Sequence, residues 1–476
     1  MDKLISAIFS GIIGMVGGIF EVFSGLVQEL LHPKQKTDYT ASFIPAGELC
    51  SVHNHGFCIT GKKSLTISQS YSNASVYGPS GSGKSTSVSI PSVFSIAKGG
   101  SSICINDPSG EIYAACSGYL ASLGYTIYRI DFSDPFSASY NCLARCKTVS
   151  DILKVVSLIL KNALGDSKAD PFWERSAAML IALFARYLLF HAAPEYRTMA
   201  NVLRLIEAFA VHPEKTDRLF AATRDEELLS AYKAILVTGD KTLQSIIATA
   251  RAALAIFSDP AVVRTTTGDS IDFSLLRTER TAIFVCNPVQ DAEYFKPLSA
   301  LFFQSLFNET MSRIPQMTAN SIFFILDEAA TIRFTSLSTT ISNIRKYRAG
   351  IMLLTQDFQS LLALYGSAEA HNIRTNTFAQ VYLKGQPLET CRELETILGR
   401  FSHSDGHTER TRQLMTVDEI RMSDDAIILC GNHAPMKVRM TQFFQRDSLR
   451  KYAQMPPYQP EPNPFAHIIP PLIPLL

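Results

Sequence analysis

The sequence predicts an α/β fold, with a P-loop nucleotide-binding domain that is interrupted by an all-α insertion and preceded by a hydrophobic helix. Three observations lead to this prediction. Residues 74–86 combine a short apolar strand, a glycine-rich turn and the start of a helix. Apolar runs typical of buried parallel strands lie on both sides of residues 150–260, where the apolar spacing is helical instead. Residues 4–20 contain no charged side chain.

The hydrophobic N-terminal segment comes first in the chain. Its uncharged run is at the lower length limit for a bilayer span, and it contains a Gly-x-x-x-Gly pattern suited to close helix packing in lipid. Lys34 and Lys36 give a weak positive bias after the run, which would place the bulk of the chain in the cytoplasm. We therefore expect residues 1–36 to form a membrane anchor or a membrane-surface helix. The alternative is a soluble oligomerisation helix.

Residues 37–149 are expected to form the first part of the nucleotide-binding domain, with the P-loop at its centre. The glycines of the loop have no Cβ and can adopt positive φ, so backbone N–H groups can converge on phosphate oxygens. A helix that begins near Lys84 directs its free N–H groups and the positive end of its dipole at the same anion. The predicted nucleotide-binding residues are Gly78, Pro79, Ser80, Gly81, Ser82, Gly83, Lys84, Ser85 and Thr86.

Hydrolysis needs acidic residues beside the P-loop, and residues 321–329 supply them. Their continuous apolarity suits a strand buried on both faces, and ligands of open α/β sheets bind where such strands end. Lys84 is expected to contact the β- and γ-phosphates of ATP, and the Ser85 hydroxyl to bind Mg²⁺. Asp327 would hold the same Mg²⁺, and Glu328 would polarise the attacking water. The alternative for the two acids is an ordinary strand exit.

Composition limits the class of protein. The chain has 476 residues, enough for two or three domains, and its net charge is only +1. Any nucleic-acid contact must therefore come from a local patch or channel. Nine cysteines without a paired Cys-x-x-Cys motif favour a reducing compartment with buried thiols. Cys50, His53, His55 and Cys58 have the spacing of no common zinc module, so we expect an ordinary strand pair there rather than a metal site.

The rest of the chain continues the α/β alternation. Residues 150–268 are expected to form the all-α inserted domain, and residues 269–454 the second part of the nucleotide-binding domain. Residues 455–476 contain eight prolines from Pro456 onward and are expected to be extended and mobile. Beyond the strand that precedes the P-loop, apolar runs predict strands at 101–107, 125–131, 282–286, 322–326, 351–355, 379–383 and 426–430.

Two further polar features follow the acidic strand. One of Arg345 and Arg348 would reach the γ-phosphate held by a neighbouring subunit, because a guanidinium can stabilise the charge of the transferring group. The alternative is a solvated basic helix end. Gln356 ends the next strand and would sense the γ-phosphate or orient water, unless it is a surface glutamine.

Several separated motifs between about Glu48 and Phe444 resemble those of the type IV secretion coupling proteins, the TraG-type ATPases of bacterial conjugation. Two residues depart from common family patterns: Ser109 stands where lysine is common, and Cys142 where proline is common. In addition to the P-loop and the acidic strand, the matching motifs are Asp107-Pro108-Ser109-Gly110-Glu111, Tyr140-Asn141, Phe172-Trp173, Arg345-Lys346-Tyr347, Gln356, Leu364-Tyr365-Gly366, Asn376 and 414–420.

This resemblance implies a RecA-like motor domain, an N-terminal membrane anchor and hexameric rings that use ATP and Mg²⁺. Such proteins hand a relaxase bound to single-stranded DNA, or another substrate, to a type IV secretion channel at the bacterial inner membrane. The family motif favours Arg345 over Arg348 as the trans-acting residue. Alternatives are a cytosolic FtsK/HerA-type DNA pump and a nucleotide-gated docking receptor with little hydrolysis. Capping of the following helix suffices to explain Asp107 and Glu111, and Trp173 is expected to be a packing anchor rather than a base-stacking platform.

Overall fold

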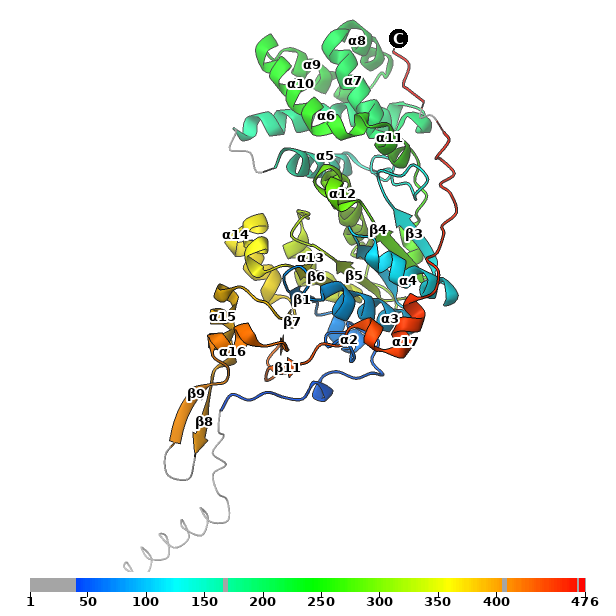
Figure 1. Cartoon of the computed structure of the whole chain (residues 1–476). Helices are drawn as coiled ribbons and strands as arrows, with labels where there is room; N and C mark the ends of the chain where they lie inside the picture. The colour runs from blue at the N-terminus through cyan, green and yellow to red at the C-terminus, as the bar shows by residue number, and fades with distance from the viewer. Residues whose placement is uncertain (1–39, 166–169, 405–408, 469–470, 476) are drawn as a thin grey trace, which may run out of the picture. The chain divides into compact units, whose positions relative to one another are not determined.

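The computed structural model describes residues 40–165, 170–404, 409–468 and 471–475 (Figure 1). Phe43–Leu398 and Met415–Leu476 form one compact unit, and a second unit includes Gly399–Leu414 with its antiparallel hairpin β8 (Arg400–Ser404) and β9 (Glu409–Gln413). The predicted membrane segment, residues 1–36, lies outside the described residues. Within the described ranges no single helix is long and apolar enough to cross a membrane, whereas one bent pair, Asp240–Ser258 with Pro260–Thr267, meets the test of length and composition.

The main unit is built on a sheet of nine strands in the order β11-β10-β7-β1-β6-β5-β2-β4-β3. All the pairings from β7 to β3 are parallel, and β10 and β11 join antiparallel. The predicted strands are found to within two residues, and the three-residue β11 was not predicted. The strands are β1 (Ala74–Tyr77), β2 (Ser102–Asn106), β3 (Thr126–Ile130), β4 (Thr281–Val285), β5 (Ile322–Leu326), β6 (Ala349–Thr355), β7 (Ala379–Tyr382), β10 (Ala426–Cys430) and β11 (Met436–Val438).

The parallel strands give the sheet two chemically different edges. At the carboxyl edge, where the parallel strands end, β1 leads into the P-loop, β2 into Asp107 and β5 into Asp327. The amino edge, where they begin, carries the turn that precedes β6. Residues at the centre of the sheet are almost completely buried, as expected for strands covered on both faces. The α-helices of the unit that lie outside residues 131–280 are α2 (Ile67–Ser70), α3 (Ile90–Lys98), α4 (Glu111–Ser122), α12 (Ala292–Thr310), α13 (Leu337–Asn343), α14 (Phe358–Thr375), α15 (Leu388–Leu398), α16 (Val417–Met422) and α17 (Asp447–Ala453).

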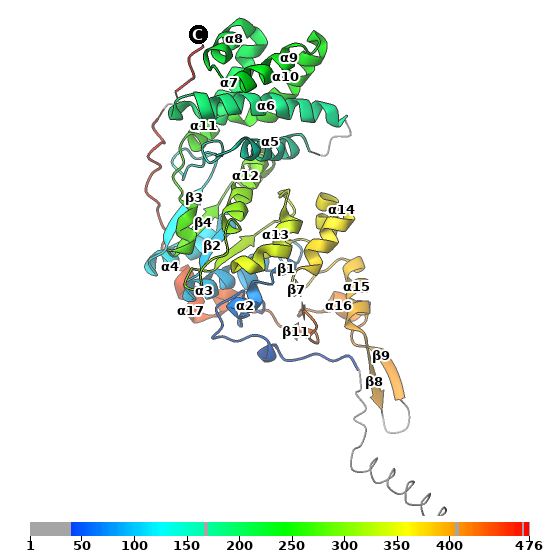
Figure 2. The same cartoon turned by 180° about the vertical axis from the view of Figure 1, so that it is seen from behind.

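A run of helices separates β3 from β4, which are neighbours in the sheet. In the described part of residues 131–280 there is no strand. Helix α12 follows β4 and packs against α5, as both views of the chain show (Figures 1 and 2). The domain limits at 150 and 268 stay predictions. The helices are α5 (Val149–Leu164), α6 (Pro171–His191), α7 (Met199–Val211), α8 (Pro213–Ala222), α9 (Glu226–Leu236), α10 (Asp240–Leu254) and α11 (Pro260–Thr267).

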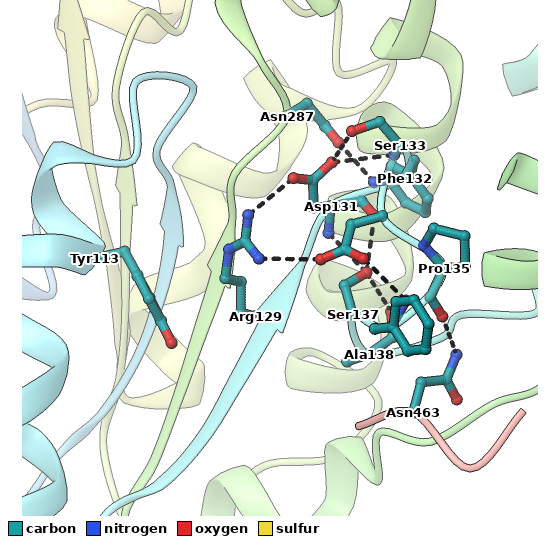
Figure 3. A network of polar contacts seen from close by, with 12 residues as sticks. Tyr113, Arg129, Asp131, Phe132, Ser133, Pro135, Ser137, Ala138, Asn287 and Asn463 are labelled. Atoms are coloured by element: carbon teal, nitrogen blue, oxygen red, sulfur yellow. Dashed lines mark hydrogen bonds and ion pairs between the residues drawn. The ribbon is translucent and has the colours of Figure 1, made fainter. Parts of the chain in front are cut away.

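The proline-rich C-terminal tail packs along the main unit instead of lying free of it. Its described residues, 455–468 and 471–475, contain no helix or strand, but they make specific contacts. The Tyr458 N–H donates to Ser117 Oγ (3.0 Å) on α4, and Asn463 bonds to the loop that follows β3 (Figure 3). Farther along, the side chain of Asn201 on α7 donates to the Pro471 carbonyl and accepts from the Ile473 N–H, each at 3.0 Å. The expectation of a mobile tail does not account for these contacts.

Candidate functional site

The P-loop connects β1 to a helix that begins at Ser85 with one wide π-helical turn and continues as α3. Gly81 and Gly83 have φ of +75° and +94°, the left-handed backbone for which glycine is suited. Gly78 does not have positive φ, but a Cβ at Gly78 would lie 2.4 Å from Ser82 Oγ. The loop therefore needs two of its glycines for backbone conformation and the third for space.

Lys84 lies at the centre of the loop and is 7% exposed. Its Nζ donates to the Gly78 carbonyl at 2.8 Å and lies 3.6 Å from Glu328 Oε1. The structure thus brings together the lysine and the acid that the sequence predicted as partners across about 240 residues of chain. Phosphate oxygens bound at the loop would compete with Glu328 for this ammonium group.

Ser85 and Asp327, the two predicted magnesium ligands, also meet. Ser85 Oγ lies 3.4 Å from Asp327 Oδ2. Asp327 is 5% exposed, and burial raises its pKa to about 6, with the neighbouring carboxylates of Glu328 and Asp107 adding to the shift. A divalent cation would stabilise the ionised form of such a carboxylate, so the donor set fits Mg²⁺.

The backbone after β5 determines where Glu328 points. The Asp327 N–H continues the ladder to β2 by donating to the Asn106 carbonyl, and the Ala329 N–H continues the ladder to β6 by donating to Leu354. Glu328 between them takes φ of +49°, which costs a non-glycine residue on the order of 1–3 kcal/mol. This conformation places its half-exposed carboxylate beside Lys84, where water can also reach it.

Two buried amides support the site and were not predicted. Asn106 Nδ2 donates to the Asp327 carbonyl at 2.7 Å, and Gln386 Nε2 donates to the Tyr77 carbonyl at 2.9 Å, one residue before the loop. Each bond joins two segments that are far apart in the sequence. In the sequence, Asn106 could have been noticed as an amide side chain at the end of an apolar run. Gln386 lies in a loop, and no sequence pattern pointed to it.

Asp107 caps α4, as expected. Its carboxylate accepts the Tyr113 N–H at 2.7 Å, and burial raises its pKa to about 6. Glu111, the first residue of α4, is exposed. Among the residues that the structure describes, no group of three or more acids, histidines and cysteines is arranged to hold a metal ion. The predicted strand pair there consists of two isolated bridges, and all nine cysteines are buried.

Gln356 and Arg345 lie at opposite edges of the sheet. Gln356 directly follows β6 at the carboxyl edge, where the Gly78 N–H donates to the Thr355 carbonyl (3.1 Å), and its side chain is exposed. Arg345 is exposed on the turn before β6, at the amino edge. The seven residues of β6 separate the edges by about 20 Å. Arg345 therefore cannot reach the P-loop of its own subunit.

Arg348 is engaged within its own chain. It has φ of +49°, and its guanidinium donates to the carbonyls of Gln316 (3.0 Å) and Met317. Arg345 has no such anchoring bond from its side chain among the described contacts. Of the two side chains, that of Arg345 is therefore the less constrained by contacts within its own chain.

These features define an α/β protein with a nucleotide-binding P-loop and a pair of acids at the carboxyl edge of the sheet. Residues 34–463 match the family described as type IV secretory system conjugative DNA transfer. Because the match covers most of the chain, the protein belongs to this family, and the family resemblance seen in the sequence is confirmed.

Known relatives agree with this assignment. The chain is 24% identical over 259 residues to the protein VirD4 of Agrobacterium fabrum; the match covers 50% of this chain and 37% of VirD4, well under half of that relative's length. The fold is similar to that of the bacterial conjugative coupling protein TrwBdeltaN70 in complex with sulphate (TM-score 0.69, 16% identity, 89% of this chain and 96% of that solved chain). It is also similar to the plasmid coupling protein TrwB in complex with ADP and Mg²⁺ (TM-score 0.68, 17% identity, 89% of this chain and 95% of TrwB).

Proposed function

We propose that the protein is an ATPase that drives DNA, or a relaxase bound to single-stranded DNA, into a type IV secretion channel at the bacterial inner membrane. The observation that carries the proposal is the meeting of Lys84 with Glu328 and of Ser85 with Asp327 at one sheet edge, in a member of the conjugative DNA transfer family. A binding-only receptor would have no need for a carboxylate held in a strained backbone beside the P-loop lysine.

The roles of the residues follow from their positions. Lys84 and the N–H groups of residues 78–86 would hold the β- and γ-phosphates of ATP. Mg²⁺ held by Ser85 and Asp327 would neutralise charge on those phosphates. Glu328, accessible to water, would accept the proton of the attacking water, and Gln356 would orient that water from the end of β6.

A ring of subunits would complete the site. Because Arg345 lies at the amino edge, it would act on the γ-phosphate of a neighbouring subunit, and a homohexamer supplies such a neighbour to every P-loop. Residues 1–36 would attach the ring to the membrane, and the inserted helices would face the cargo.

ATP turnover of the full chain, measured alone, with single-stranded DNA and with duplex DNA, tests this function. We expect basal hydrolysis that single-stranded DNA stimulates. Stimulation by duplex DNA alone would instead indicate a duplex pump of the FtsK/HerA type. Tight ATP binding without turnover in the presence of either DNA would contradict the proposal and indicate a docking receptor.

A further inference from the structure

Arg277 is a partly buried cation for which no role was predicted. It is the last residue of the 3₁₀ turn Phe273–Arg277, on the segment that returns from α11 to the sheet. Burial lowers its pKa to about 10, and the nearby charge of Arg348 acts in the same direction. Within the described residues no carboxylate forms an ion pair with it, so its guanidinium is held by neutral groups.

Four main-chain carbonyls surround this guanidinium. Nη2 donates to Tyr347 at 2.6 Å and to Thr310 at 3.3 Å, while Nη1 donates to Asn320 at 2.9 Å and to Arg348 at 3.4 Å. The acceptors belong to the end of α12, the entry to β5 and the turn before β6. A planar fork reaches all four carbonyls from two separate nitrogens, whereas a lysine ammonium has only three donors, all on one nitrogen.

The turn before β6 is the segment that carries Arg345. Arg277 holds it from one side through the carbonyls of Tyr347 and Arg348. Arg348 holds it from the other side through the loop at 316–317, and its own left-handed backbone ends the turn. The position of Arg345 therefore depends on the guanidinium groups of Arg277 and Arg348, whose own contacts lie within the same chain.

We infer that Arg277 is a positioning residue that sets the orientation of the Arg345 turn and so controls how well Arg345 meets the γ-phosphate of the neighbouring subunit. This inference rests on the proposed function. It also gives the inserted helices a direct connection to hydrolysis, because Arg277 ends the segment by which the chain leaves them.

The test compares Arg277→Lys, Arg277→Met and Arg345→Ala in the full chain. Arg277→Lys keeps the positive charge but lacks the two separate nitrogens of the guanidinium. We therefore expect its kcat to fall by about 10- to 100-fold while its ATP affinity stays unchanged. The fall in kcat for Arg277→Met should be only slightly larger. Exposed Arg280, which donates to the Leu123 carbonyl instead, supplies the matched control: Arg280→Lys should turn over normally.

A double variant separates positioning from mere stability. If Arg277 acts through Arg345, adding Arg277→Lys to Arg345→Ala should cost less than about twofold more in kcat. The inference would be overturned if the double variant lost kcat by the product of the two single losses, or if Arg277→Lys alone had a normal rate. If Arg277 variants fail to fold, Arg348→Asn removes the second anchor while tolerating the left-handed backbone, and the same non-additivity with Arg345→Ala is expected.

The outcomes also distinguish this inference from the proposed function. Full activity of Arg345→Ala would overturn both, since no trans-acting arginine would then exist at this turn. A slow Arg345→Ala together with a normal Arg277→Lys would overturn only the role of Arg277.

Discussion

The two edges of the sheet differ in the charges that they bury. The carboxyl edge buries Asp107 and Asp327, whose pKa values burial raises, together with the ammonium group of Lys84. The amino edge instead holds the partly buried guanidinium of Arg277 among carbonyl groups and exposes Arg345. Under the proposed function, one edge would bind the magnesium nucleotide, and the other would supply a cation for phosphoryl transfer. The difference teaches that, if the proposal holds, a complete hydrolytic site would need edges from two copies of the chain.

The largest expected effect tests whether the two edges that form one site belong to different subunits. Lys84→Ala should abolish turnover because it removes the charge that holds the phosphates, and Arg345→Ala should lower kcat by about 10³-fold or more while keeping ATP affinity. Mixed rings of the two variants should regain partial activity, because some intact P-loops then face intact arginines. ATPase assays of the mixtures measure this.

The matched control for Arg345 is Lys346→Ala, which changes an exposed cation on the same turn and should leave the rate unchanged. The absence of recovery in rings that demonstrably contain both variants would contradict the division of the site between edges. So would full activity of monomeric wild-type protein.

The second effect concerns the carboxyl edge alone. Glu328→Gln should bind ATP as tightly as wild type and hydrolyse it about 10²- to 10⁴-fold more slowly, because the amide cannot accept the proton of water. Nucleotide titration together with steady-state turnover checks both parts. Normal turnover would show that another group at this edge serves as the base.

The third effect is on stability and its dependence on pH. Burial raises the pKa of Asp107 to about 6, whereas an unfolded aspartic acid has about 4. The folded chain therefore holds this proton more tightly, and the free energy of unfolding falls by on the order of 2–3 kcal/mol as the pH rises from about 4 to 6. Asp107→Asn keeps an acceptor for the Tyr113 N–H but has no proton to lose at this position. Its free energy of unfolding should therefore not fall in this way as the pH rises.

Melting temperatures across this pH range test the prediction. The difference between Asp107→Asn and wild type should become more positive as the pH rises and level off above about pH 7. The exposed Glu111 gives the control, and Glu111→Gln should show a flat difference. If the difference in melting temperature between Asp107→Asn and wild type did not change with pH, the pKa of Asp107 would not be raised in the folded chain.

Sequence patterns predicted the sheet well because its strands are buried on both faces and read as apolar runs. They also predicted that the acids after β5 lie beside the P-loop, since parallel strands bring their carboxyl ends together. They could not predict the left-handed backbone of Glu328, which arises from ladders to two different strands. Nor could they predict Asn106, Gln386 and Arg277, whose partners are carbonyl groups brought close only by the fold.

The contacts of the C-terminal tail could not be predicted for a related reason. Proline-rich sequence has no hydrophobic period, so nothing in it indicated that Ala466 and Ile473 would be buried. Its docking depends on single side chains, such as Asn201, that meet main-chain groups of the tail one at a time. Such contacts leave no repeating signal in the sequence.

The smallest expected effect tests whether the C-terminal tail stabilises only the carboxyl edge of the sheet. Asn463 Nδ2 donates to the Pro135 carbonyl at 3.2 Å in the loop after β3, at the carboxyl edge (Figure 3). Asn463→Ala should weaken this loop by about 1 kcal/mol, the usual contribution of one hydrogen bond. Hydrogen exchange should then quicken several-fold in residues 131–137 and stay unchanged in residues 344–348, because the second segment lies at the other edge. Asn308→Ala, which alters an exposed side chain on α12, should leave both segments unchanged. Equal quickening at both edges would mean that the tail stabilises the whole unit and that the edges do not differ in this respect.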